Sequence, residues 1–177
     1  MCSDKDIKIA SSRPSKSPQF HKTEPIQNTV KTETKKAAKQ IGEKVAELFA
    51  DEVSYANIGE MDNGELISQR RLLLCFTAIA SLENYISDEA VSDIAKKSFL
   101  DTLKKMDMSL YKASSEMGAF SFYYLALRRG TDVIRRIGQT FAMLCSHDGD
   151  PIFQEMGEAL YCWFSSQAKK TILELLK

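Results

Sequence analysis

Apolar and polar positions follow helical spacing along almost the whole chain beyond residue 31. In the stretch 32–56 apolar residues return every three or four positions, whereas Lys44, Glu47 and Asp51 take the opposite face. This pattern is typical of an amphipathic helix with one face against a core. The apolar positions of this first predicted helix are Ala38, Ile41, Val45, Leu48, Phe49 and Val53. A run of turn formers, Asn57–Gly64, ends it.

The second predicted helix, about Glu65–Ile86, is apolar nearly all round after a polar opening that contains Arg70 and Arg71. Its apolar residues are Leu72, Leu73, Leu74, Cys75, Phe76, Ala78, Ile79, Ala80 and Leu82. A helix without a polar face belongs in the middle of a bundle. We therefore expect this helix to form the centre of the fold.

Caps and breakers divide the middle of the chain into two further helices. Ser87 is placed to cap a third helix that ends near Lys105. The stretch from Met108 to Arg129 predicts one fourth helix, and Gly118 is the position at which it can kink.

Two more helices complete the prediction. Gly130 is a stop signal, and Thr131 or Asp132 is placed to cap a fifth helix. Asp150 followed by Pro151 is the clearest start in the chain, because proline fits the first helical position. This start predicts a sixth helix that reaches the C-terminus.

The fold class is thus predicted as all-α, a single compact bundle of five to six helices over residues 32–177. The chain has 177 residues, 44% of them hydrophobic, which suffices for one core. Residues 1–31 contain three of the four prolines and much Ser, Lys and Thr. Such a segment buries too little apolar area to offset its ordering entropy. We therefore expect a disordered N-terminal tail.

Charge is distributed unevenly although the formal net charge is zero. Residues 1–40 carry nine basic and four acidic residues, which leaves 15 basic and 20 acidic residues in the body. A Lys-rich tail of this kind is typical of a solvated arm. The acidic body would repel polyanions and no nucleic-acid-binding motif is present, so the sequence argues against nucleic-acid binding.

Cysteine usage predicts a reduced, cytoplasmic setting. Cys75, Cys145 and Cys162 fall in apolar helical stretches and, with Cys2, show no close-paired metal spacing. Residues 1–19 lack the apolar run of a secretory signal. The longest apolar runs are too short for a bilayer, so we expect no membrane span.

Candidate reactive groups are few. His21 and His147 are the only histidines, which excludes a histidine metal triad, and no Glu-x-x-His pair is present. The sequence predicts no metal and no cofactor. An enzyme hypothesis can still be stated, with Cys145 or Cys162 as nucleophile and His147 as base. A structural role for these thiols is the better interpretation.

Aromatic residues concentrate in the fourth and sixth predicted helices. Eight of the sixteen lie there: Phe120, Phe122, Tyr123, Tyr124, Phe153, Tyr161, Trp163 and Phe164. Aromatics at helical spacing usually belong to the core. However, residues one apart diverge by about 100° around a helix, so consecutive aromatics cannot all face inward. Some aromatic surface must meet another helix, a partner or solvent.

Two arginine pairs accompany these aromatics. Arg128 and Arg129 precede Arg135 and Arg136 by seven residues, and the four would form one stripe if the chain stayed helical through Gly130. Such a stripe would suit phosphate or an acidic partner. Asp132, which lies four residues from both Arg128 and Arg136, would partly neutralise it.

The leading hypothesis is a non-catalytic binding module, an adaptor, regulator or self-associating protein. It would bind a protein partner or its own copy through an aromatic surface on the C-terminal helices. The alternative is a small-molecule receptor with an apolar pocket between the fourth and sixth helices. The candidate binding residues are Tyr123, Tyr124, Arg128, Arg135, Tyr161 and Trp163, and no residue is assigned a catalytic role.

Overall fold

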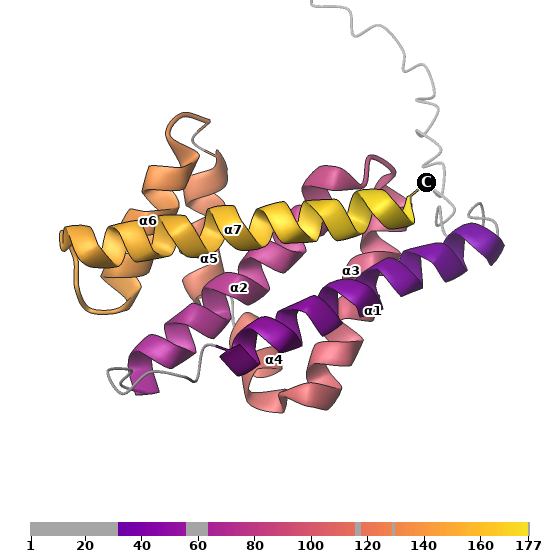
Figure 1. Cartoon of the computed structure of the whole chain (residues 1–177), viewed down its shortest axis with the longest axis horizontal. Coiled ribbons are helices and arrows are strands. Elements are labelled where there is room, and N and C mark those ends of the chain that lie inside the picture. Colours follow the sequence, from indigo (N-terminus) through magenta and orange to yellow (C-terminus); the bar gives the residue numbers. More distant parts are fainter. Residues whose placement is uncertain (1–31, 56–63, 116–117, 129, 177) are drawn as a thin grey trace, which may run out of the picture.

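The computed structural model describes residues 32–55, 64–115, 118–128 and 130–176 of the chain. These residues contain seven α-helices (Figure 1). They are α1 (Thr32–Tyr55), α2 (Gly64–Tyr85), α3 (Glu89–Met106), α4 (Met108–Ser115), α5 (Gly118–Arg128), α6 (Val133–Leu144) and α7 (Pro151–Leu175). These residues contain no strand, so the all-α class is confirmed, whereas the predicted five to six helices are too few. The tail at 1–31, predicted to be disordered, lies outside the described residues.

α2 is the centre of the fold, as its apolar composition predicts. It contacts each of the other six helices, and every residue from Leu72 to Leu82 is buried. The buried Thr77 hydroxyl donates to the Leu73 carbonyl of the same helix at 2.8 Å. Because a buried hydroxyl without an acceptor is costly, this bond allows a polar residue inside an apolar helix.

Two helix pairs are held close by glycine, α1 on α3 and α6 on α7. Gly42 of α1 faces the backbone of α3 at Ala95, and Gly157 of α7 faces the Phe141 side chain of α6. A larger residue at either glycine would push its helix away from its neighbour. The close approach lets the short chain bury a continuous core.

Asp88 rather than Ser87 caps the third helix, which corrects the predicted cap by one position. The Asp88 carboxylate accepts a hydrogen bond from the Val91 amide at 3.1 Å. The predicted cap of the last helix is confirmed, because the Asp150 carboxylate accepts from the Ile152 amide at 2.9 Å. Aspartate and serine cap equally well, so local preference alone does not separate neighbouring candidates.

The stretch predicted as one fourth helix contains two helices within the described residues, and residues 116–117 between them lie outside that range. α4 ends at Ser115 and α5 begins at Gly118. α4 itself starts at an extended residue, Asp107, with φ −146° and ψ 95°. The Asp107 carboxylate accepts from the Ser109 and Leu110 amides, each at 3.0 Å, and so caps α4.

α5 and α6 form a helical hairpin, because the chain reverses between them. Gly130 has φ 73° and Asp132 has φ 52°, both in the left-handed region that ends a helix. The condition for a single arginine stripe, a helix that continues through Gly130, is therefore not met, and the predicted stop at Gly130 is confirmed. Arg128 and Arg135 lie on different helices at the same end of the hairpin.

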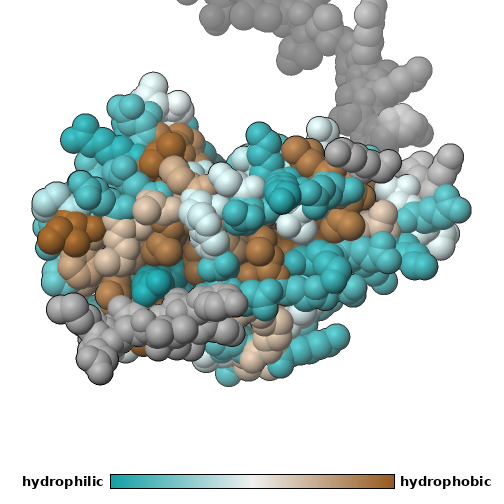
Figure 2. Space-filling view, in the orientation of Figure 1, coloured by the Kyte–Doolittle hydropathy of each residue, from teal (hydrophilic) through white to brown (hydrophobic). Residues whose placement is uncertain are grey.

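The surface of the bundle is uneven in polarity. In the view of Figure 2 the strip over α1 is largely hydrophilic, whereas hydrophobic residues gather along α7. Within the described ranges, none of the helices combines the length and the apolar character needed to cross a membrane.

Candidate functional site

Large apolar side chains are exposed mainly on the last three helices. Among the described residues nine of the eleven lie there or directly after α7: Phe122, Leu125, Ile134, Met143, Ile152, Trp163, Leu173, Leu175 and Leu176. The other two, Met106 and Met108, lie where α3 meets α4. Single exposed apolar residues are ordinary on a protein surface. Their concentration on α5–α7 makes this part of the bundle the candidate contact surface.

The three consecutive aromatics of α5 point in different directions, as their spacing predicts. Phe122 is 49% exposed, Tyr123 is completely buried and Tyr124 is half-buried. The Tyr123 ring stacks on Phe76 of α2 with centroids 5.0 Å apart, and the Tyr124 ring meets Phe76 edge-on at 5.1 Å. Phe122 is therefore the most exposed of these three aromatics.

Tyr123 and Tyr124 serve the packing of α5 on the rest of the bundle. Burial raises the pKa of Tyr123 well above its ordinary value, and its hydroxyl has no hydrogen-bond partner among the described residues. The Tyr124 hydroxyl donates to a Glu83 carboxylate oxygen at 3.4 Å. Burial, together with the charge of Glu83, raises the pKa of Tyr124 to about 12. Both phenols therefore stay protonated at neutral pH.

The aromatics of α7 divide in the same way. Phe164 is completely buried, whereas Trp163 is 42% exposed. Tyr161 is half-buried, and burial raises its pKa. α6 packs on both α5 and α7, so the two aromatic-rich helices meet α6 rather than forming one aromatic surface with each other.

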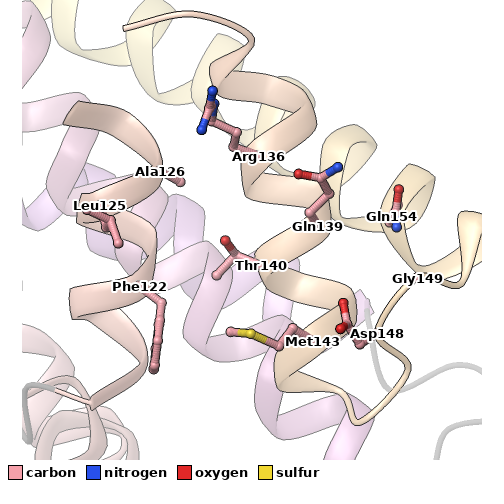
Figure 3. A pocket seen from close by; sticks show the side chains of 10 residues that line it. All are labelled: Phe122, Leu125, Ala126, Arg136, Gln139, Thr140, Met143, Asp148, Gly149 and Gln154. Atoms are coloured by element: carbon pink, nitrogen blue, oxygen red, sulfur yellow. The ribbon is translucent and has the colours of Figure 1, made fainter. Parts of the chain in front are cut away.

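A groove of about 390 Å³ lies between α5 and α6 (Figure 3). Its lining residues are Phe122, Leu125 and Ala126 of α5, Arg136, Gln139, Thr140 and Met143 of α6, Asp148 and Gly149 of the following turn, and Gln154 of α7. In Figure 3 the Thr140 and Met143 side chains point from α6 toward α5. The groove lies one helix away from the pocket that the sequence predicts between the fourth and sixth helices.

The two ends of this groove carry opposite charges. Arg136 lines one end and Asp148 the other (Figure 3). Arg128 and Arg135 flank the hairpin turn at the Arg136 end. Among the described residues no carboxylate forms an ion pair with these three arginines, and the Arg136 Nε donates to the Thr131 carbonyl at 2.9 Å. Asp132 in the turn supplies one carboxylate, so the three arginines leave this end with a net positive charge.

The six predicted binding residues fall in three places. Tyr123 and Tyr124 pack on α2, Arg128 and Arg135 are exposed beside the hairpin turn, and Tyr161 and Trp163 lie on α7. The structure adds Leu125 and Met143, which the sequence reasoning missed. A signal for Leu125 was present, because Phe122 and Leu125 share one face of a helix whose other face is already apolar.

The cysteine thiols are set for packing rather than for nucleophilic attack. Burial raises the pKa of Cys75 to about 12 and that of Cys145 to about 11, and burial also raises the pKa of Cys162. The His147 ring stacks on Phe153 with centroids 3.8 Å apart. A reactive thiol requires a lowered pKa. These observations give no support to a pairing of either C-terminal thiol with His147.

Other polar clusters have structural explanations. Within the described ranges, no three side chains of His, Cys, Asp and Glu gather closely enough to hold a metal ion. A second cavity, of about 280 Å³, lies beside the start of α3. Lys96 in its wall pairs with Glu83 at 3.0 Å and with Asp93 at 2.9 Å. The pair with Glu83 ties α3 to α2, whereas the pair with Asp93 lies within α3.

The chain matches no protein-family model, no curated protein and no solved structure.

Proposed function

We propose that the chain is a non-catalytic binding module, an adaptor, regulator or self-associating protein of the cytoplasm. Its contact surface lies on α5, α6 and α7, and it takes up a protein partner or a second copy of the chain. The observation that carries this proposal is the concentration of exposed apolar side chains on these three helices. Buried apolar area is the dominant favourable contribution in most protein associations.

Phe122, Met143 and Trp163 are the central residues of this proposal. Each exposes roughly two fifths to one half of its surface, and the three come from three different helices. Aromatic and methionine side chains are enriched in protein interfaces, where they contribute large contact areas. Tyr124 is a poorer choice for a test, because its removal would also disturb the packing on Phe76.

The test is a triple variant, Phe122→Ser with Met143→Ser and Trp163→Ser, in the full chain. Its matched control is Met106→Ser with Met108→Ser, which removes equally exposed apolar residues from the α3–α4 corner. Sedimentation measures oligomeric mass, and quantitative affinity capture compares bound proteins. We expect the triple variant to lose the self-association or the partners that the control retains. Equal behaviour of the wild type and both variants would contradict the proposal.

A small-molecule receptor is the second candidate, favoured by the volume of the α5–α6 groove. About 390 Å³ falls within the range of roughly 300–1,000 Å³ that is common for ligand sites. Most of the lining residues are exposed to solvent, however, whereas a ligand site buries most of its ligand. Ligand-observed NMR with a library of small apolar compounds tests this candidate. The receptor hypothesis fails if no compound binds the wild-type protein more tightly than the Met143→Ser variant.

A further inference from the structure

We propose that the α5–α6 groove binds one amphipathic helix of a partner protein, with acidic residues at that helix's C-terminal end. This inference rests on the proposed function, because it names the site and the partner chemistry within the same contact surface. The occupant is a helix about three turns long, with an apolar face toward the groove and carboxylates near the hairpin turn.

The shape of the groove suits a helix. Its walls are the outer faces of two helices joined as a hairpin, so a third helix laid on them would complete a three-helix layer. α6 contains 12 residues and therefore extends for about 18 Å, which corresponds to roughly three turns of an occupant. Recognition of an amphipathic helix in an apolar groove is a common mode of peptide binding.

The apolar anchors lie on both walls. Phe122 and Leu125 are three residues apart, so they share one face of α5, and they are 49% and 47% exposed. Met143 of α6 is 39% exposed and points toward them (Figure 3). A methionine adapts its shape to a partner at little cost, which suits a contact that must accept a helix surface.

Charge selects the occupant among apolar helices. Arg128, Arg135 and Arg136 concentrate positive charge at the hairpin end, and no carboxylate of the described residues is paired with them. A partner carboxylate would relieve their mutual repulsion and form charge-assisted hydrogen bonds. The partner residues that face this end are therefore Asp or Glu.

The opposite end sets the direction of the bound helix. Asp148 lies in the groove wall away from the arginines (Figure 3). The N-terminus of a helix carries partial positive charge and its C-terminus partial negative charge. An occupant with its N-terminus at Asp148 and its acidic C-terminus at Arg136 satisfies both ends at once.

A nucleic acid fits this groove less well. Its phosphates would meet the arginines but also Asp148, and its backbone would leave Phe122 and Leu125 without an apolar partner. The apolar anchors and the opposite charges of the two ends together favour an amphipathic helix.

The test uses the full chain and two capped 14-residue helical peptides. Both carry leucines at positions 3, 7 and 10, and they differ only in the last turn, which holds three glutamates in one and three lysines in the other. Titration calorimetry gives the affinity, and amide NMR shifts of 15N-labelled protein locate the site. We expect the glutamate peptide to shift α5 and α6 resonances and to bind at least tenfold more tightly than the lysine peptide. Binding should weaken as salt rises.

Charge reversal at Arg136 gives a more specific test. Arg136→Glu should lower the affinity for the glutamate peptide at least tenfold and raise the affinity for the lysine peptide. Simple unfolding cannot produce these opposite changes. Phe122→Ser and Met143→Ser should each lower the affinity for both peptides. Met108→Ser, at the α3–α4 corner and outside the groove lining, is the matched control and should change neither affinity. Trp163→Ser is measured alongside it, because Trp163 belongs to the proposed contact surface but not to the groove lining.

Three outcomes would overturn the inference. One is the absence of shifts with either peptide, and another is loss of binding in Trp163→Ser but not in Phe122→Ser, which would leave the proposed function intact on α7. The third is tighter binding of a 12-nucleotide single-stranded DNA than of the glutamate peptide, with no effect of Phe122→Ser. The proposed function itself would fail on a different result: equal oligomeric mass and equal captured partners for the wild type, the triple variant and its control.

Discussion

Gly42 of α1 lies directly against Ala95 of α3, so close that a Cβ at residue 42 would collide with the Ala95 carbonyl oxygen. The same contact region contains a hydrogen bond between the helices, from the Ser98 hydroxyl to the Lys39 carbonyl at 3.0 Å. Glycine thus allows α1 and α3 to touch backbone to backbone. The atoms that a side chain at residue 42 would meet cannot move aside easily, because they are backbone atoms and a Cβ of α3.

Gly42→Ala should therefore destabilise the protein. Alanine favours a helix by about 1 kcal/mol over glycine, but forced overpacking costs about 1–3 kcal/mol and more against rigid backbone. We expect a net loss of about 2 kcal/mol in the free energy of unfolding, measured by urea denaturation. Gly64→Ala is the control, because no atom lies within 4 Å of its added Cβ, and it should leave stability equal or higher. Equal stability of both variants would refute the close approach.

Phe76 should be far more important for stability than the exposed Phe122. Its ring meets Phe120 at 5.6 Å as well as Tyr123 and Tyr124, so it joins α2 to α5. Phe76→Ala should cost about 3–5 kcal/mol, because it opens a cavity in the core. Phe122→Ala should cost about 0.5 kcal/mol or less, as is usual for surface positions. Similar losses in urea denaturation would place Phe122 in the core.

Asp107 should stabilise the protein in a pH-dependent way. The hydrogen bonds from Ser109 and Leu110, with the charge of Arg71 nearby, lower the pKa of this carboxyl below its ordinary value of 3.8. A lowered folded pKa adds stability that is present above the unfolded pKa and is lost as pH falls through the folded pKa. Asp107→Ala should therefore cost about 1 kcal/mol at pH 7 and less as the pH falls below about 4.

Asp107→Asn is the control for this cap. The amide oxygen still accepts from the helix amides but does not titrate, so this variant should retain most of the stability with a flatter acid limb. Thermal unfolding between pH 2 and 7 makes the comparison. If Asp107→Ala lost the same amount of stability at every pH, the ionised carboxylate of Asp107 would not be the stabilising form of the cap.

Thiol titration should find no activated cysteine. In a Cys2→Ser background, Cys162 should react first with a disulfide reagent at pH 8, because it is the least buried of the remaining three. Cys75, with a pKa raised by burial to about 12, and Cys145, raised to about 11, should react only as the protein opens. Their rates should therefore rise with urea.

The pH profile of the same reaction tests the enzyme hypothesis. Each rate should keep rising above pH 8.5, the ordinary pKa of a free thiol. A thiol that reaches its full rate near pH 6 would be activated, and it would bring back the pairing of Cys145 or Cys162 with His147.

Helix positions followed closely from local sequence signals. The unbroken apolar run at 72–82 predicts a central helix because no face of it can meet water, and α2 has that place. Asp150 and Pro151 predict the start of α7 because both act within one turn of the chain. The structure differs from the prediction where two local solutions are nearly equal in energy. Ser87 and Asp88 are both good caps, and Gly118 suits the start of a helix as well as a kink.

The candidate surface was only partly predictable. Three consecutive aromatics on α5 cannot share one direction, so exposure of one of them follows from helix geometry alone. Which one is exposed depends on Phe76, because the packing of Tyr123 and Tyr124 on this ring turns Phe122 outward. Met143 carried no comparable signal, because methionine is equally at home in a core.

The amino-acid sequence by itself determined an all-helical chain with a central apolar helix, since periodicity and caps act over a few neighbouring residues. Only the tertiary structure decided that α5 folds back on α6, that Arg128 and Arg136 come to one end of a groove, and that Leu125 and Met143 line it. The physical reason is that exposure depends on which helix covers a given face. That choice is made by contacts between residues far apart in the chain.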